Sequence, residues 1–187
     1  MTENTDIDHR FDRVTSVLYP FSGLSKVDPT ILRNAADRGT QVHIHCDCIV
    51  KDIPMDDVHE DHQGYVDSFK IWAEGKNFLE NPKRFYCDDL LITGECDGLY
   101  EKDGETILFD IKTPLRESST WPLQGSAYAY LAAKYGYKIS KVEFIKVDKH
   151  GKEPVVYEYR IDVDEFMNIL NIYRKYFKNV KTDYTDY

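Results

Sequence analysis

The sequence has 187 residues, which is enough for one domain with a buried core and too few for two ordinary domains. Hydrophobic residues make up 42% and aromatic residues 13% of the chain, a globular composition that excludes an intrinsically disordered protein. The formal net charge of −9, taken alone, argues against nucleic acid as a partner, because nucleic-acid-binding proteins usually carry a basic surface. A local basic groove or bound cations would reverse that argument.

The sequence also bears on the compartment. No apolar run approaches the roughly 18–20 residues of a membrane span. The N-terminal segment MTENTDIDHR is polar and acidic, so we expect neither a membrane partner nor a signal peptide. The cysteines form no CxxC pair; they are Cys46, Cys48, Cys87 and Cys96. We therefore expect reduced thiols in a cytoplasmic protein, or in the host cytoplasm if the protein is viral.

The first part of the chain is expected to be mainly helical. Residues 1–13 are polar and expected to be frayed, and residues 14–21 are expected to form a short edge strand or an extended arm. An Asp-Pro pair predicts the start of a helix over residues 28–50, which a central glycine weakens or bends. After a loop, a second amphipathic helix is predicted over residues 60–80.

The rest of the chain mixes strands with helices. The patterns predict three strands, a helix, two strands and a final helix, at residues 83–92, 94–101, 106–112, 121–135, 141–148, 154–161 and 163–178. A polar tail follows at residues 180–187. This order predicts one α+β or α/β domain over residues 1–187, in which a single mixed sheet has helices packed on its faces.

Acidic residues around a predicted hairpin form the first candidate site. If Asp103-Gly104 is a two-residue type I′ turn, Asp97 lies opposite Asp110 on one face of the hairpin. Opposed carboxylates destabilise a sheet, so a divalent cation such as Mg²⁺ is the natural compensation. The alternative is a solvated face on which Glu95 and Lys112 form a surface ion pair worth about 0–1 kcal/mol. The apolar neighbours of Asp110 favour a buried strand instead, where a carboxylate needs a partner.

The sequence around this hairpin resembles the PD-(D/E)xK nuclease superfamily. Gly94-x-x-Asp97 and Asp110-Ile111-Lys112 resemble its GxxD and (D/E)xK motifs. The segment RGTQVH (38–43) resembles the helix motif of its RecB-like branch, and QGSAY (124–128) resembles the QxxxY motif of that branch. The four motifs follow one another in the family's order within residues 14–130. The resemblance implies a restriction-endonuclease-like core, in which helices flank a central mixed sheet.

The resemblance also implies a role for each matching residue. His43, Asp97 and Asp110 would bind the metal, together with the backbone carbonyl of Ile111. Lys112 would orient or deprotonate the attacking water, so that Asp97, Asp110 and Lys112 form the catalytic set. The implied cofactor is Mg²⁺ or Mn²⁺, as one or two ions. Such an ion lowers the pKa of a bound water and screens the phosphoryl oxygens, as phosphodiester hydrolysis requires.

Four further residues are candidates for binding the substrate. Gln124 and Tyr128 are spaced i and i+4, share one face of the predicted helix, and would hold the site or the DNA strand. Tyr128 would hydrogen-bond a phosphate or stack on a base. Arg38 and Arg116 flank the site in sequence and are candidate phosphate contacts. Most such charges are simply solvated, and Arg38 is alternatively the structural partner of an acid.

The sequence departs from the family pattern in two respects. Many relatives carry another acid on the strand before GxxD, whereas here Asp88 and Asp89 sit late, and Glu95 is the candidate substitute. Some relatives hold an iron–sulfur cluster through cysteines near both ends, but no cysteine follows Cys96, so no cluster is expected. Structural zinc at HIHCDC (43–48) is not expected either, because helix positions two apart point about 200° apart.

These features together predict a Mg²⁺- or Mn²⁺-dependent deoxyribonuclease. We expect an exonuclease of the RecB-like type that hydrolyses phosphodiester bonds at DNA ends or in single strands. Further expected partners are a recombination or replication protein and a second copy of the chain. The alternative is a non-cleaving nuclease-fold module that binds DNA ends or a protein partner, as the acidic charge and the missing upstream acid suggest. A third reading is a structural or inhibitory protein whose acidic surface mimics nucleic acid.

Overall fold

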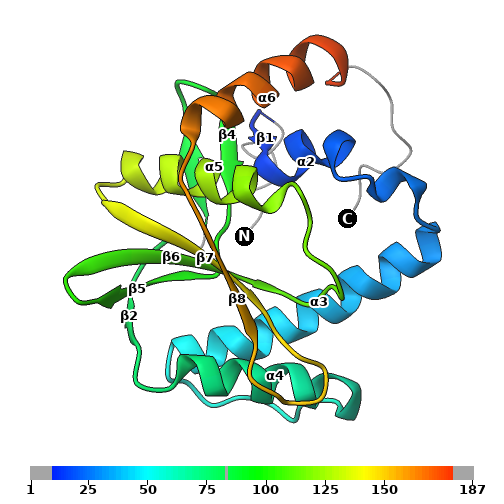
Figure 1. Cartoon of the computed structure of the whole chain (residues 1–187), viewed down its shortest axis with the longest axis vertical. Coiled ribbons are helices and arrows are strands. Elements are labelled where there is room, and N and C mark those ends of the chain that lie inside the picture. The colour runs from blue at the N-terminus through cyan, green and yellow to red at the C-terminus, as the bar shows by residue number, and fades with distance from the viewer. Residues whose placement is uncertain (1–9, 83, 179–187) are drawn as a thin grey trace, which may run out of the picture.

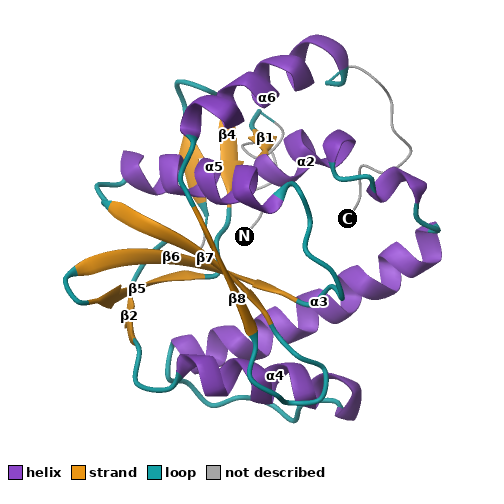
Figure 2. Cartoon of the chain, viewed as in Figure 1, coloured by secondary structure: helices purple, strands orange, loops and turns teal. Residues whose placement is uncertain are grey.

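The computed structural model describes residues 10–82 and 84–178. The fold is mixed α/β, with two mixed sheets flanked by helices (Figures 1 and 2). The strands are β1 (Asp12–Arg13), β2 (Asn77–Leu79), β3 (Phe85–Cys87), β4 (Ile92–Gly94), β5 (Gly98–Lys102), β6 (Glu105–Lys112), β7 (Ile139–Lys146) and β8 (Val155–Tyr159). The larger sheet has the order β2-β5-β6-β7-β8 and the smaller one the order β1-β4-β3. In each sheet one pair is parallel, β6 with β7 and β1 with β4.

The helices lie in two groups. They are α2 (Val14–Leu18), α3 (Pro29–Val50), α4 (Glu60–Ala73), α5 (Trp121–Lys134) and α6 (Val163–Tyr176), with two short 3₁₀ helices at Tyr19–Phe21 and Leu24–Lys26. Helices α3 and α4 cover one face of the larger sheet, while α5 lies against the other face and packs in turn on α2 and α6 (Figure 1). In the part of the chain that the structure describes, no helix is both long and apolar enough to cross a membrane.

The long helix α3 begins and ends close to where the sequence predicts. Asp28 caps it by accepting hydrogen bonds from the amides of Thr30 (2.8 Å) and Ile31 (3.3 Å), and Pro29 occupies the first turn. Gly39 does not interrupt the helix, contrary to the predicted weak point. This glycine instead lies close to Thr113, just beyond the end of β6, so α3 runs past the end of the central strand.

The predicted extended conformation of residues 14–21 is wrong. The segment is helical and buries Val14, Val17 and Leu18, whose i, i+3 and i+4 spacing forms one apolar helix face. The expected fraying is also wrong for residues 10–13, while residues 1–9 lie outside the described part. Phe11 and the β1 residue Asp12 are buried, because β1 pairs with β4 and Asp12 has cationic partners on the C-terminal side of the molecule.

The second predicted helix is too long. Helix α4 ends at Ala73, and Gly75 adopts a left-handed backbone with φ of 70°, which turns the chain back. Residues 77–79 then form β2 against β5 instead of a last helical turn. The physical reason is tertiary, because Phe78 lies among the aromatic rings of Trp72 and Phe109 only when it belongs to the sheet.

The single predicted sheet is divided in two. Residues 95–97 connect β4 to β5 and belong to neither ladder. Here the Asp97 carboxylate, and not a backbone carbonyl, accepts the hydrogen bond of the Ile111 amide at 2.5 Å. A side chain thus replaces a rung of the ladder, and the strands separate at the point where the candidate site lies.

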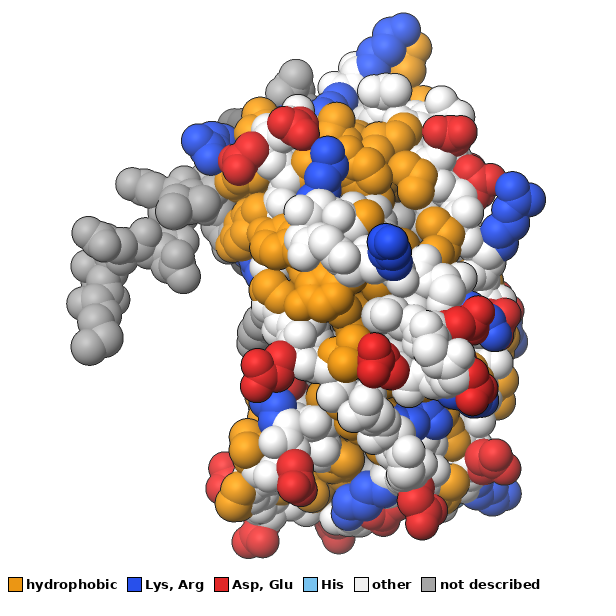
Figure 3. Space-filling view, turned by 90° about the vertical axis from the view of Figure 1, so that its left-hand side faces the viewer, with side chains coloured by type: hydrophobic (Ala, Val, Ile, Leu, Met, Phe, Trp, Pro, Cys, Tyr) orange, Lys and Arg blue, Asp and Glu red, His pale blue; other side chains and the backbone are white. Residues whose placement is uncertain are grey.

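The two faces of β6 belong to different cores. Ile107, Phe109 and Ile111 face α3 and α4, whereas Leu108 faces the α5 side, as the two-residue period of a strand requires. Asp110 is two positions from Leu108 and therefore lies on the same face of β6. It is only 4% exposed, so its carboxylate is buried beside apolar side chains. Acidic and basic side chains are interspersed on the face shown in Figure 3, and hydrophobic side chains gather in its upper half. The described part of that face carries no continuous basic surface.

Candidate functional site

The hairpin adopts the predicted register. Asp103 and Gly104 both have positive φ angles, 52° and 78°, as a type I′ turn requires. Pairing runs from Lys102 opposite Glu105 to Gly98 opposite Phe109. One step further along, the same register brings Asp97 to Asp110.

Two contacts hold the Asp97 carboxylate at the end of β6. Its Oδ2 accepts the Ile111 amide, and its Oδ1 lies 2.6 Å from Nδ1 of His43, which α3 carries across the end of the strand. Burial opposes the charge of His43, but the carboxylates of Asp97 and Asp110 outweigh it and raise the His43 pKa. Burial also opposes ionisation of Asp97, yet the charge and hydrogen bond of His43, the Ile111 amide and the Lys112 charge lower the Asp97 pKa.

Asp110 has a different environment. Nζ of Lys112 lies 2.6 Å from its Oδ2, but this buried oxygen has no hydrogen bond of good geometry within the described residues. Burial raises the pKa of Asp110, Lys112 opposes the rise, and the Asp97 carboxylate adds to it. The two neighbouring carboxylates are therefore shifted in opposite directions, an arrangement that is common where acids have separate chemical roles.

Lys112 is the first member of a hydrogen-bonded chain. It donates to Oε1 of Gln124 at 3.0 Å, and Nε2 of Gln124 donates to the Tyr128 hydroxyl at 2.8 Å. The lysine ammonium also lies 4.9 Å from the centre of the Phe144 ring. Gln124 and Tyr128 are both buried, on one face of α5 as their spacing predicts. The geometry thus favours the first of their two predicted roles, holding the site, over holding a DNA strand.

Packing explains the glycine of the GxxD segment. A Cβ atom added at Gly94 would lie 2.7 Å from Cε1 of Tyr128, closer than side chains approach one another. The ring of Tyr128 therefore occupies the space above β4 that any other residue would fill. The segments at Gly94 and at Tyr128 are far apart in the sequence, but they pack directly against each other in the fold.

The residues enclose a cavity of about 250 Å³. Six of the predicted site residues line it, namely His43, Asp97, Asp110, Lys112, Gln124 and Tyr128. The wall also includes Arg13, Thr15 and Arg84, which the sequence reasoning missed. These three residues belong to no sequence motif. They reach the site because β1 and β3, which they adjoin in the sequence, both pair with β4. The cavity wall thus carries both cations and acids.

Glu95 also lines this cavity, but its partner is not the expected one. Oε2 of Glu95 lies 3.0 Å from Nη2 of Arg84, so the proposed Glu95–Lys112 surface pair is wrong. Lys112 is turned inward, where Asp110 and Gln124 hold it. Glu95 remains in the cavity wall with Asp97.

The other predicted residues lie outside this cavity wall. Arg38 lies over the Tyr65 ring of α4, with its guanidinium carbon 5.8 Å from the ring centre. Arg116 is exposed on the loop between β6 and α5. Ile111 packs its side chain into the core under α3 and lines a larger neighbouring cavity of about 970 Å³. The structure therefore does not bring Arg38 or Arg116 together with the acids.

The donor set can be compared with what a divalent ion requires. Two carboxylates and an imidazole, with the poorly satisfied Oδ2 of Asp110 among them, suit Mg²⁺ or Mn²⁺, which prefer oxygen ligands. As placed, His43 and Asp97 bond to each other and Asp110 contacts Lys112. Within residues 10–82 and 84–178, no three His, Cys, Asp or Glu side chains converge as a ready-made metal cage. The residue types fit the ion, and binding would require the His43–Asp97 contact to open.

Comparisons with known proteins leave the family open. No family model matches the sequence, and no curated protein matches it. A solved protein described as "Crystal structure of SSO0001" superposes with a TM-score of 0.47 at 12% identity, over 94% of this chain and 81% of that one.

Proposed function

We propose that this chain is a divalent-metal-dependent deoxyribonuclease with a restriction-endonuclease-like core, of the RecB-like exonuclease type. The observation that carries the proposal is convergence. Four separate elements, α3, the β4–β5 connection, β6 and α5, bring an imidazole, two carboxylates, a lysine and its glutamine support to one small cavity. The four cysteines are free thiols, which supports a cytoplasmic location.

Each residue has a role that its surroundings support. His43, Asp97 and Asp110 would hold Mg²⁺ or Mn²⁺, with Glu95 as the candidate additional acid. The bound ion would supply a water of lowered pKa and relieve charge on the phosphate. Lys112 would orient the attacking water or receive its proton, while Gln124 fixes the position of the ammonium. Arg84 and Arg13 stand on the wall where a phosphate would need positive charge.

Degradation of end-labelled DNA in Mg²⁺ or Mn²⁺ tests the proposal. We expect the wild-type protein to shorten the labelled strand, and the Asp110→Ala and Lys112→Ala variants to leave it intact. EDTA should abolish the reaction, because the carboxylates alone supply no nucleophile. Full activity of either variant would refute the assigned mechanism.

The second candidate is a nuclease-fold module that binds DNA ends or a protein partner without cutting. The observation that favours it is that the cations of the chain itself already neutralise the acids, through His43–Asp97 and Lys112–Asp110. Wild-type protein that shifts DNA in a gel, but never cleaves it with any divalent ion, would establish this alternative.

A further inference from the structure

We propose that the larger cavity beside the site is a subsite for one unpaired nucleobase next to the scissile phosphate, an inference that rests on the proposed nuclease function. The two cavities share a wall made of His43, Glu95 and Asp97. A group that enters the larger cavity therefore lies next to the reacting centre. Its volume of about 970 Å³ is ample for a base and its sugar and is typical of small-molecule sites, which hold about 300–1,000 Å³.

Charge separates the two cavities. The smaller one has Arg13, Arg84 and Lys112 in its wall beside Glu95, Asp97 and Asp110, so phosphate oxygens would meet positive charge there. Among the described residues, the lysine in the wall of the larger cavity is Lys51, whose ammonium is 2.7 Å from Asp47, one helical turn earlier. Carboxylates otherwise predominate among its charged groups. A phosphate would be repelled there, whereas a neutral base would not.

The walls of the larger cavity suit a flat, partly apolar group. Ile44 and Val50 from α3 face Phe78 and Leu79 from β2. The Phe78 ring already packs on Phe109, 5.6 Å between ring centres, so a base would extend an existing aromatic cluster. Thr40 and Asn81 supply hydroxyl and amide groups for the polar edge of a base. A base that enters between α3 and β2 in this way can no longer be paired with a complementary DNA strand.

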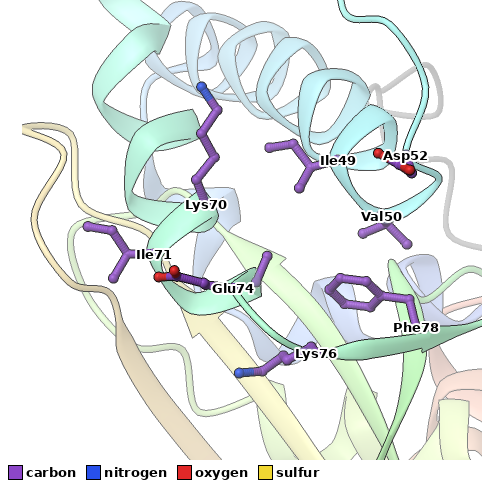
Figure 4. Close-up of a pocket in the computed structure, with 9 residues that line it drawn as sticks. Ile49, Val50, Asp52, Lys70, Ile71, Glu74, Lys76 and Phe78 are labelled. Carbon is purple, nitrogen blue, oxygen red and sulfur yellow. The ribbon is translucent and has the colours of Figure 1, made fainter.

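A second groove continues the path. Val50 and Phe78 also line a cavity of about 630 Å³ at the ends of α3 and α4, drawn in Figure 4. This groove carries Lys70 and Lys76 together with Asp52 and Glu74, so the continuation of the path has charges of both signs. From His43 to Val50 the path follows α3 for about 10 Å, at 1.5 Å per residue. The substrate class that follows is a DNA end with at least one unpaired nucleotide.

A double-mutant cycle on binding tests the subsite. A short fluorescein-labelled single-stranded oligonucleotide is titrated in Ca²⁺ and followed by anisotropy, intact or with one stable abasic residue placed at each position in turn. Ile44 is 52% exposed on α3, so Ile44→Glu adds charge to the cavity wall without disturbing the core. Ile31→Glu is the matched control, since Ile31 is 61% exposed on the same helix and lines neither cavity.

We expect one abasic position to weaken binding about tenfold, the fold-change of a lost stacking contact. Ile44→Glu should weaken binding of the intact oligonucleotide by a similar factor and have no more effect than Ile31→Glu on that abasic oligonucleotide. An Ile44→Glu penalty that persists on the abasic oligonucleotide, or equal affinity at every abasic position, would overturn the subsite. Cleavage is measured in parallel in Mn²⁺. Binding that depends on the base, without cleavage, would refute the proposed nuclease activity and support the subsite. Cleavage without any dependence on the base would support the nuclease activity and refute the subsite.

Discussion

Two buried carboxylate clusters in this protein differ in how their acids are paired. Asp12 on β1 accepts a hydrogen bond from Nε of Arg174 at 2.9 Å, and Nζ of Lys178 lies 2.9 Å from its other oxygen. One acid thus faces two cations, and Arg174 also donates to the carbonyls of Leu90 and Leu91. This cluster ties the N-terminal strand to the C-terminal helix across more than 160 positions of sequence.

The acids of the candidate site are arranged differently. There, Asp97 and Asp110 share His43 and Lys112, Glu95 stands nearby, and the group lines a cavity. A buried acid with surplus cations needs nothing further, whereas two adjacent acids with one oxygen poorly satisfied are suited to receive a cation. The Asp12 cluster therefore has the character of a structural contact and the Asp97–Asp110 cluster that of a binding site. Substitutions in the Asp12 cluster should mainly affect stability, and substitutions in the Asp97–Asp110 cluster should mainly affect activity.

The same chemical change in both clusters gives the sharpest test. Asp110→Asn keeps the shape of the side chain but removes the charge, so DNA cleavage should fall about a thousandfold or more. The free energy of unfolding should change by less than about 1 kcal/mol, because the lost ion pair is offset by the relief of a buried charge. Cleavage of end-labelled DNA and urea unfolding measure the two effects. Asp12→Asn is the control, and it should leave cleavage by the folded protein unchanged.

The second prediction concerns the Asp12 cluster. Arg174→Ala should lower the free energy of unfolding by about 2–4 kcal/mol, because Asp12 loses a cationic partner and two carbonyls lose a donor. Urea denaturation followed by circular dichroism gives the value. The exposed Arg160→Ala should cost less than about 0.5 kcal/mol. A large loss of cleavage per folded molecule in Arg174→Ala would erase the distinction between the two clusters.

A third substitution probes the contact under the site. Gly94→Ala places a methyl group against the Tyr128 ring, so stability should fall by about 1–3 kcal/mol. Gly39→Ala is the matched control, since its added Cβ would lie 3.7 Å from Thr113 Oγ1, an ordinary contact, and alanine favours a helix. Thermal unfolding of the two variants should therefore move in opposite directions. Equal stability of Gly94→Ala and the wild type would show that Tyr128 does not need this glycine.

The smallest expected effect tests how Lys112 is positioned. Gln124→Leu removes the acceptor of the lysine, so kcat should fall about tenfold while KM stays near the wild-type value. Tyr128→Phe keeps the ring in place and removes only the hydroxyl that Gln124 contacts, so its effect should be smaller. Steady-state cleavage of a labelled oligonucleotide separates the two constants. A rise in KM without a fall in kcat would instead assign Gln124 to the DNA strand.

Local patterns predicted a large part of this arrangement. The type I′ turn at residues 103–104 set the register that brings Asp97 to Asp110, because a two-residue turn leaves one pairing. The Asp28 cap and the i, i+4 spacing of Gln124 and Tyr128 were equally local, and both features lie where they were expected. Residues 14–21 show the limit of such reasoning, since they were expected to be extended although their apolar spacing fits the helix that they form.

Contacts between distant segments were beyond the reach of the sequence. The sequence by itself determined which acids and which lysine form the candidate site and which helix face supports the lysine. It could do so because turn type and helical period depend on only a few neighbouring residues. Only the tertiary structure decided that Glu95 pairs with Arg84 and that Arg38 packs on Tyr65. It also decided that a second cavity opens beside His43, because that cavity lies between α3 and β2, which are 27 positions apart in the sequence. No local rule specifies such distances, which depend on how two cores pack against the two faces of one sheet.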